Sequence, residues 1–374
     1  MKILINGRFL TQKTTGVQRV ARQLTLALDA LIASGAAPDI RATIAIPGRA
    51  AADLPPYSCI QSARIGRMTG HAWEQLELPK AVGDSWLLSL CNTGPLAVRR
   101  QLVLIHDAQV FTAGYSYGRA FRTAYRILLP ALARRVRTVA TVSGFSAKEL
   151  AAHGVRNKNG IKLIHNGADH METIEADSTT LARHGLRAGS YILALGSLAP
   201  HKNIDMLVRA ALARRGAATE LVIAGGGAAI FSGGAPKPGG GARYLGRVSD
   251  RELKSLYQNA LALAFPSLTE GFGLPPVEAM QCGCPVLAST GGAIPEVCGD
   301  AVMYIAPDDQ AGWTEAMERI EADQDLRARL SQAGRRRAAL FTWERAVRAL
   351  LASLAPEGAP SHGRVPAGGL KAEG

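Results

Sequence analysis

Two carboxylates in the second half of the chain, Glu270 and Glu278, flank a turn rich in glycine and proline. The turn follows the apolar run 261–265, which has strand length, and it opens a helical pattern with proline in its first turn. Glycine lets the backbone approach a ligand, and a helix start presents N–H groups that favour phosphate. An ionised carboxylate accepts hydrogen bonds from vicinal hydroxyls. The segment therefore predicts a ligand in which sugars flank a phosphate, which describes a nucleotide sugar.

The alternative is that Glu278 complements a helix dipole while Glu270 is a solvated loop residue. The intervening residues favour the ligand site, because E-G-F-G-L-P-P-V-E at 270–278 and the segments 284–286 (CPV) and 291–296 (GGAIPE) follow a known signature. It resembles that of the retaining GT-B glycosyltransferases of family 4. The resemblance implies an α/β fold of two facing Rossmann-like domains with an interdomain cleft. It also implies transfer of a hexose from a nucleoside diphosphate sugar with retention of configuration, without a tightly bound metal or other cofactor.

The composition agrees with a two-domain protein. The chain has 374 residues, of which 47% are hydrophobic. No apolar run reaches the length of a membrane span, and the start MKILINGRFL turns polar too early for a signal peptide, so we expect a cytoplasmic protein. Five cysteines argue against a disulfide framework and favour packed thiols.

The net charge of +13 requires an anionic partner or surface. Nucleic acid is disfavoured as this partner, because aromatic residues make up only 5% and no recognised module is present. A diphosphate substrate or an anionic membrane surface fits better.

The first half begins with a strand at 2–6, a polar loop and a helix pattern from Val17. Gly16 is either a plain turn before that helix or a point where the loop approaches the phosphate or sugar, and the resemblance favours the second role. His106 follows a strand at 102–105, at the edge where doubly wound sheets bind ligands. There it can bond a sugar hydroxyl or phosphate oxygen, and we expect it to change charge near neutral pH.

An aromatic loop at 111–117 precedes a run of arginines: Arg119, Arg122, Arg126, Arg134, Arg135 and Arg137. We interpret this region as the lip of the acceptor site and as a basic face for a membrane that carries a lipid-linked sugar. A solvated arginine face is an equal alternative.

The second half restarts with a strand at 191–195 and the segment 196–203, which matches G-x-L-x-x-x-K-[NG] of the same family. A lysine after a strand end is a natural diphosphate ligand, and the resemblance assigns this role to Lys202, with Ser197 and Asn203 beside it. Many relatives carry an arginine directly after the glycine or directly before the lysine of this segment, where this chain has Ser197 and His201. A second positive contact to the diphosphate is therefore unassigned. The glycines at 225–227 fit neither an ATPase nor a dehydrogenase motif.

The resemblance also assigns roles within the donor site. It places the ribose hydroxyls on Glu278 and the transferred sugar on Glu270, with His106 as the second catalytic candidate. It places the departing phosphate on backbone N–H groups near Gly273 and Leu274. The remaining binding residues that it implies are Gly271 and Phe272 in the same turn and, around the base, Gly246 and Val248. The D-x-D sequence at 323–325 lies within a polar helical stretch and predicts a solvated face instead of a metal site.

We expect an acceptor domain at 1–170, a linker at 171–189, a nucleotide-sugar-binding domain at 190–340, a helix at 341–355 that crosses back, and a disordered tail at 356–374. The stretches WEQLELP at 73–79 and TGVQRVA at 15–21 resemble bacterial surface-polysaccharide enzymes, which favours GDP-mannose as donor. Two other classes stay open: a nucleotide-sugar epimerase with paired Rossmann-like domains, and a basic nucleic-acid-binding protein.

Overall fold

The architecture is described from a computed structural model in which residues 1–116, 118–196, 199–225 and 242–354 are placed. Ser197, the glycines at 226–227 and the tail predicted at 356–374 lie outside the described residues.

The first domain is built on a seven-stranded sheet of parallel strands, in the order β3-β2-β1-β4-β5-β6-β7. Its strands are β1 (Lys2–Asn6), β2 (Arg41–Pro47), β3 (Gln61–Ile65), β4 (Trp86–Ser89), β5 (Gln101–Leu104), β6 (Thr138–Thr141) and β7 (Ile161–Leu163). Its helices are η1 (Gly7–Thr11), α1 (Gly16–Ala33), α2 (Gly70–Leu76), α3 (Leu78–Val82), α4 (Gln109–Thr112), η2 (Gly114–Ser116), α5 (Arg119–Arg135), α6 (Gly144–Ala152) and η3 (Lys158–Gly160).

The second domain is built on a six-stranded parallel sheet in the order β10-β9-β8-β11-β12-β13. Its strands are β8 (Tyr191–Leu195), β9 (Glu220–Ala224), β10 (Ala242–Gly246), β11 (Ala262–Phe265), β12 (Val286–Ser289) and β13 (Met303–Ile305). Its helices are η4 (Pro200–Lys202), α9 (Ile204–Ala213), α10 (Asp250–Asn259), α11 (Leu274–Gln281), α12 (Ile294–Cys298), α13 (Gln310–Ala322) and α14 (Gln324–Ala338).

Both sheets are covered by helices on their two faces, so their central strands are buried throughout. Every residue of β4, β5, β6, β11 and β12 is buried. This is why these segments read as continuous apolar runs and not as alternating ones.

Helix starts are set locally, as at Ser249, whose side chain forms a capping box with Glu252 at the start of α10.

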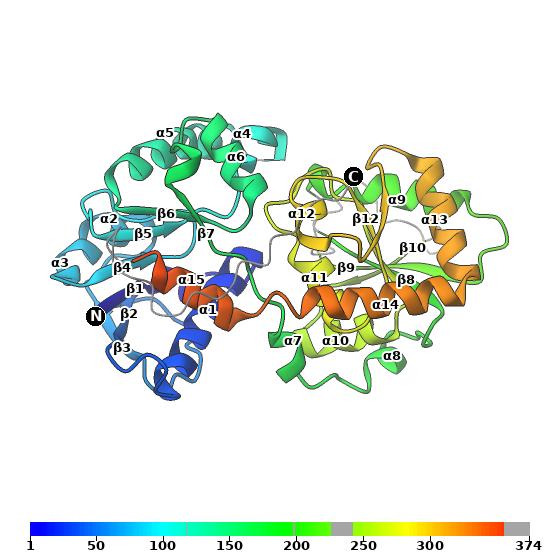
Figure 1. Ribbon diagram of the computed structural model, residues 1–374, viewed down its shortest axis with the longest axis horizontal. Coiled ribbons are helices and arrows are strands. Elements are labelled where there is room, and N and C mark those ends of the chain that lie inside the picture. The colour runs from blue at the N-terminus through cyan, green and yellow to red at the C-terminus, as the bar shows by residue number, and fades with distance from the viewer. Residues whose placement is uncertain (117, 197–198, 226–241, 355–374) are drawn as a thin grey trace.

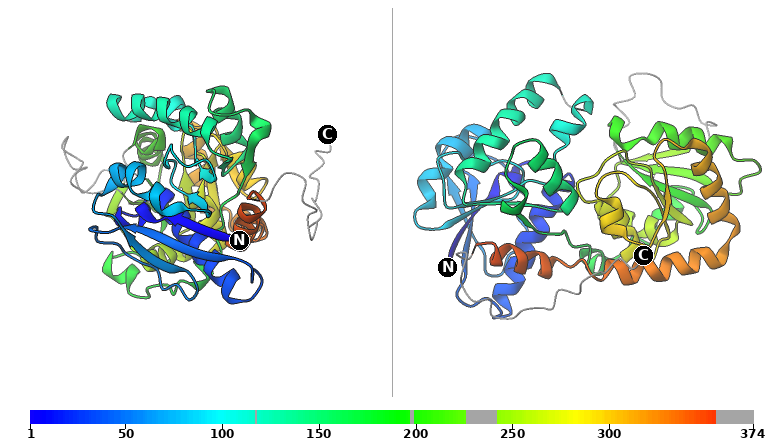
Figure 2. Two further views of the ribbon diagram at one scale, coloured as in Figure 1. Left: turned by 90° about the vertical axis from the view of Figure 1, so that its left-hand side faces the viewer. Right: turned by 45° about the horizontal axis from the view of Figure 1, so that its top comes forward.

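The two sheets stand side by side, and the chain crosses between the domains twice (Figure 1). The first crossing contains the short helices α7 (His170–Thr173) and α8 (Thr180–Arg183), so the expected irregular linker at 171–189 is partly helical. The second crossing leaves α14 and leads into α15 (Trp343–Ala352), which packs against α1 of the first domain (Figures 1 and 2).

In each sheet the strand order reverses at one point, between β1 and β4 in the first domain and between β8 and β11 in the second. Open parallel sheets bind ligands in the crevice at the carboxyl ends of the strands at such a point. The loops that follow β8 and β11 contain Lys202 and Glu270, respectively. The expectation of an α/β fold with two Rossmann-like domains is confirmed.

Candidate active site

Lys202 and Glu270 meet where the loops after β8 and β11 come together. The Lys202 Nζ lies 2.6 Å from Oε1 of Glu270, and it also stands 5.7 Å from the ring centre of Phe265. Glu270 is 8% exposed, so the ion pair is largely sheltered from water. The two residues that sequence reasoning assigned to the diphosphate and the transferred sugar therefore share one site, although 68 positions separate them.

The start of α11, which follows Glu270 in the chain, offers a small set of backbone donors. Gly273 caps the helix with φ of 92°, a left-handed conformation that favours glycine. Pro275 and Pro276 follow, and they have no N–H group. The amides of Gly273 and Leu274 are thus the donors of this helix start, and within the described part of the chain no hydrogen bond uses them.

Glu278 lies deeper, on α11, and is only 3% exposed. Its Oε1 is 3.2 Å from His170 Nε2, and its Oε2 accepts from the Tyr257 hydroxyl at 3.3 Å. The Trp343 indole N–H donates to His170 Nδ1 at 3.1 Å, which leaves the His170 proton on Nε2, facing Glu278. Burial opposes ionisation of Glu278, but the His170 hydrogen bond and the charge of Arg19 outweigh it, so the pKa of Glu278 is lowered.

The turn between the two glutamates is clasped by the first domain. The Gly271 carbonyl accepts from the Ser143 hydroxyl at 2.6 Å and from the Ser146 hydroxyl at 3.0 Å. A Cβ at position 271 would lie 2.5 Å from the His106 carbonyl oxygen and 2.8 Å from Cβ of Asp107. Glycine is therefore required at 271 by the close approach of the two domains.

Phe272, which the resemblance implies as a binding residue, turns its side chain into the core of the protein. Its ring is 4% exposed and packs edge-on against Phe341 at 5.6 Å, with His165 at 6.2 Å. The apolar ring is better buried than exposed to a hydroxylated ligand. Phe272 anchors the turn in the core and leaves ligand contacts to the backbone.

His106 is placed at the predicted sheet edge but is 5% exposed. Its Nε2 is 2.8 Å from the Leu90 carbonyl, and because a carbonyl only accepts, Nε2 carries the proton. Burial lowers the pKa of His106 to about 4, with the Leu90 hydrogen bond opposing this shift. The expected change of charge near neutral pH is wrong, since the imidazole stays neutral there.

Asn203 takes a left-handed conformation with φ of 56°. Its amide nitrogen donates to the carbonyls of Pro266 at 3.3 Å and Pro307 at 2.6 Å. The side chain is thus used to hold the loops after β8, β11 and β13 together. The side-chain donor group of this predicted binding residue is therefore engaged within the domain.

Gly16, Gly246 and Val248 are brought together across the domain boundary. Gly16 opens α1 with no atom within 4 Å of where its Cβ would stand, and Gly246 ends β10 with φ of 69° and the same open surroundings. Arg247 lies between Gly246 and Val248, and its guanidinium donates to the Thr14 carbonyl at 2.9 Å. The loop before α1 therefore faces the turn after β10.

Further pairs close the boundary between the domains. Glu296 on α12 accepts from the backbone amides of Gly144 and Phe145 at the start of α6, at 2.8 and 2.9 Å. Arg19 on α1 pairs with Asp250 at 2.5 Å. The structure is thus a closed arrangement, in which the second domain reaches the first at several points.

Some site residues were not predicted from the sequence. His170 and Tyr257 contact Glu278, and Asp107 lies against the Gly271 turn. In the first domain, Arg8 pairs with the fully buried Glu74 at 3.1 Å. Asp107 and Arg8 each lie just after a strand, and this position in the sequence could have marked them as candidates. Nothing in the sequence around His170 or Tyr257 indicates their contacts with Glu278.

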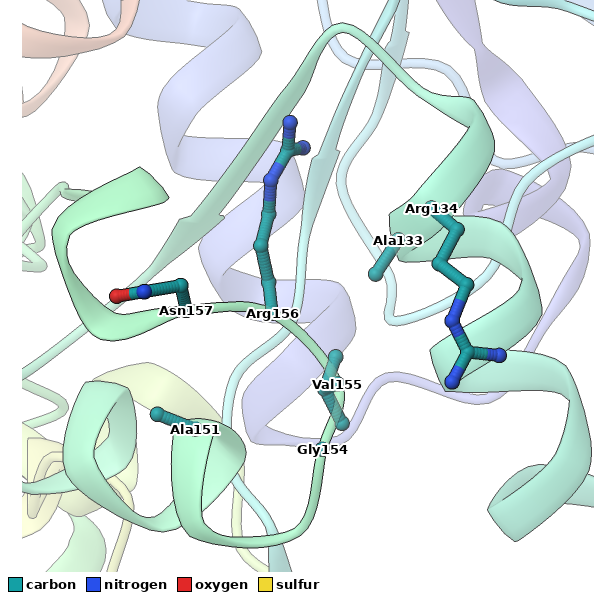
Figure 3. Close-up of a pocket in the computed structure, with 7 residues that line it drawn as sticks. All are labelled: Ala133, Arg134, Ala151, Gly154, Val155, Arg156 and Asn157. Carbon is teal, nitrogen blue, oxygen red and sulfur yellow. The ribbon is translucent and has the colours of Figure 1, made fainter.

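The described residues of the first domain line at least two cavities. One, of about 390 Å³, is at the carboxyl edge of its sheet and is lined by residues that include Arg8, Asp107 and Tyr125. The other, of about 370 Å³, lies between the ends of α5 and α6 (Figure 3). There the guanidinium groups of Arg134 and Arg156 point to opposite sides, and that of Arg156 donates to the Val136 carbonyl at 3.2 Å. The second cavity therefore does not enclose an anion between two arginines.

Within the described part of the chain, no group of three or more His, Cys, Asp or Glu side chains is arranged to hold a metal ion. Asp323 of the D-x-D sequence caps α14, where it accepts from the Leu326 amide at 2.8 Å. Over the same residues, none of the helices has both the length and the apolar character needed to cross a membrane.

Comparison with known proteins identifies the fold and the second domain. Sucrose-phosphate synthase from Thermosynechococcus elongatus superposes with a TM-score of 0.72 over 94% of this chain and 97% of that one, at 20% identity. Anabaena Alr3699/HepE, in complex with UDP and glucose, does so with a TM-score of 0.70 over 95% and 99%, at 16% identity. The chain has the GT-B fold.

Residues 183–337 match the family model described as Glycosyl transferases group 1. This GT-B region contains the Lys202–Glu270 pair and all of α11. The O-antigen chain mannosyltransferase RfbU of Salmonella typhimurium is 29% identical over 64% of this chain. The chain matches 66% of that relative's length, just under two thirds.

Proposed function

We propose that the protein is a glycosyltransferase that moves a hexose from a nucleoside diphosphate sugar to a saccharide acceptor. The observation that carries the proposal is the Lys202–Glu270 pair at the switch point of the second sheet, on a loop that continues into the start of α11. The match of this same region to the glycosyl transferases group 1 model supports it.

The donor is proposed to lie along the second domain. Its diphosphate would accept from Lys202 and from the amides of Gly273 and Leu274, because these are the positive groups of the site. The transferred sugar would then contact Glu270, and the ribose would contact Glu278. Each carboxylate oxygen has more than one lone pair, so Glu278 retains acceptor capacity beside His170 and Tyr257.

Donor binding must rearrange the ion pair. Lys202 and Glu270 are in contact at 2.6 Å, and a diphosphate would draw Lys202 toward itself while a sugar hydroxyl took its place on Glu270. The pair thus holds both groups in position before the donor arrives, which lowers the entropic cost of binding.

We propose retention of configuration by front-face departure and attack, with the leaving phosphate taking the proton of the acceptor hydroxyl. The amides of Gly273 and Leu274 would stabilise charge on the departing phosphate, an effect that is larger in a closed site. Neutral His106 would act through hydrogen bonding and not as an acid. No tightly bound metal is required, and a trapped covalent glycosyl-enzyme would contradict this mechanism.

We further propose a mannose-type donor, GDP-mannose, and a lipid-linked acceptor from polysaccharide assembly, because RfbU, to which the chain is similar, is named as an O-antigen chain mannosyltransferase. The acceptor would bind the first domain. Arginines on α5 would rest on an anionic membrane, which makes the protein peripheral to that surface, and nucleic acid is not a proposed partner.

The test is a screen of GDP, UDP and dTDP sugars by thermal shift, followed by transfer assays with the stabilising donor. A bound donor raises the unfolding temperature by mass action. Lys202→Ala should remove the shift, whereas Lys254→Ala, on α10 and bonded to the Ile174 carbonyl at 2.6 Å, should keep it. The proposal fails if no nucleotide sugar stabilises the protein. Conversion of the donor alone into another sugar would favour an epimerase.

A further inference from the structure

The cavity at the carboxyl edge of the first sheet has the make-up of a site for a small polar ligand. Its volume of about 390 Å³ falls within the usual range for such sites, roughly 300–1,000 Å³. It lies between the start of α1 and the middle of α5, over the loops that follow β1, β4 and β5. This position is the switch point of the first domain, as Lys202 and Glu270 mark that of the second.

One wall of the cavity is aromatic. Phe121 and Tyr125 on α5 stack with ring centres 4.1 Å apart, and both line the cavity together with Leu129. The lining also includes the neutral amides of Gln12, Gln18 and Asn92. A lining that combines aromatic rings with amides suits a sugar ring, which has an apolar C–H face and an edge of hydroxyls.

The arginine charge in this cavity is compensated by a carboxylate. Arg8 donates from Nε to Glu74 at 3.1 Å and from a terminal nitrogen to the Thr93 hydroxyl at 2.8 Å. Glu74 is fully buried and also accepts from Asn6 at 2.7 Å. A guanidinium that is already paired with a carboxylate presents hydrogen-bond donors without a net positive field. The cavity is therefore better suited to a neutral sugar than to a phosphate or a uronic acid.

Asp107 lies where this cavity reaches the donor site. It lines the cavity, and its Cβ is the atom that a side chain at 271 would meet at 2.8 Å. Its Oδ1 accepts from the Gln109 amide at 2.9 Å, which fixes the orientation of the carboxylate. Burial, and then the neighbouring charge of Glu270, raise the pKa of Asp107.

We infer that the cavity binds the terminal sugar of a neutral saccharide acceptor, and that Asp107 accepts a hydrogen bond from the hydroxyl that attacks the donor. The inference rests on the proposed glycosyl transfer. In that step the acceptor oxygen bonds to the anomeric carbon while the bond from that carbon to the phosphate oxygen breaks. The electron pair leaves with the diphosphate, and the hydroxyl proton passes to it. Asp107 orients the hydroxyl, and Tyr125 carries the ring of the acceptor.

The test compares Asp107→Asn and Tyr125→Ala with the wild type in transfer to a panel of p-nitrophenyl hexosides. A hydrogen bond to a charged group corresponds to a loss of about 10- to 100-fold, which we expect in kcat/KM for the acceptor with Asp107→Asn. Tyr125→Ala should raise the acceptor KM about tenfold or more. Ile127→Ala, on the same helix, 68% exposed and outside the cavity lining, should match the wild type.

Donor binding separates the two ways in which the test can fail. Thermal shift by the stabilising nucleotide should persist in Asp107→Asn and Tyr125→Ala, which also shows that both variants fold. If the wild type neither binds a donor nor transfers, the proposed function fails. If it transfers and both variants keep the wild-type acceptor KM and kcat, the acceptor inference is overturned. Preference for a p-nitrophenyl glucuronide over neutral hexosides would overturn the assignment to neutral sugars.

Discussion

The hydrogen-bond chain from Trp343 through His170 to Glu278 predicts that a residue of the crossing helix influences donor binding. Trp343→Phe keeps an aromatic ring but removes the N–H that fixes the proton of His170 on Nε2. His170 can then place its proton on Nδ1, which turns a lone pair toward the Glu278 carboxylate at 3.2 Å. Glu278 would lose a donor, and its position would become less defined.

The size of the effect of Trp343→Phe follows from the buried polar atoms that lose a hydrogen-bond partner. A lost hydrogen bond that leaves a buried polar atom unsatisfied costs about 1–3 kcal/mol, so unfolding free energy should fall by about this amount. If Glu278 holds the ribose, donor affinity should weaken roughly three- to tenfold, because that corresponds to about 0.7–1.4 kcal/mol. Denaturant unfolding measures the first quantity, and titration with the nucleotide measures the second.

Trp313 supplies a matched control. It is fully buried in the same domain as Glu278, and its indole N–H donates to the Ala306 carbonyl at 3.0 Å. Trp313→Phe removes the same kind of bond and the same atoms, so its loss of stability should be similar. Its donor affinity should be unchanged. Equal donor affinity in the two variants would refute the link between the crossing helix and Glu278.

Three further predictions concern other parts of the molecule. The pKa of His106 falls from about 6.5 in the unfolded chain to about 4 in the fold, so the folded state resists protonation. The free energy of unfolding should therefore drop by roughly 3 kcal/mol as the pH falls from 6.5 to 4. Denaturant titrations of His106→Gln should show a smaller change of this free energy with pH. Gly271→Ala should push the domains apart, because its Cβ would lie 2.5 Å from a backbone oxygen; small-angle scattering should show a larger radius of gyration than for Gly118→Ala, which has open space. Arg119→Glu with Arg134→Glu should reduce sedimentation with anionic liposomes, and unchanged sedimentation would exclude these arginines from a membrane surface.

Much of the fold was predictable because its signals are local. The strands β1 and β8 have the bounds that their apolar runs predict, and α1 begins one residue before its predicted start. The strands β3, β12 and β13 were not predicted. Every residue of β3 is at least partly exposed, so it lacks the apolar run that marks the central strands. The strand β12 is a short buried run directly after Pro285, and such a run does not distinguish a strand from other buried segments.

The meeting of Lys202 and Glu270 at one sheet edge was predictable for a related reason. Lys202, Glu270 and the amide of Gly273 each follow a strand of the second sheet, and parallel strands bring their carboxyl ends to one edge. The packing of the Phe272 and Asn203 side chains was not predictable, because proximity to that edge does not determine which way a side chain turns. Phe272 turns into the core against Phe341, which lies 69 positions later in the chain.

From its sequence alone, this chain specifies two parallel sheets and the residues that stand at their ligand edges, because hydrophobic periodicity, glycine turns and helix caps act over a few residues. Only the tertiary structure decides what surrounds those residues. His170 reaches Glu278 from 108 positions away, and Asp107 lies against Gly271 from the other domain. Such contacts depend on how the two sheets pack against each other. Burial in the folded structure keeps His106 neutral and shelters the pair of Lys202 and Glu270.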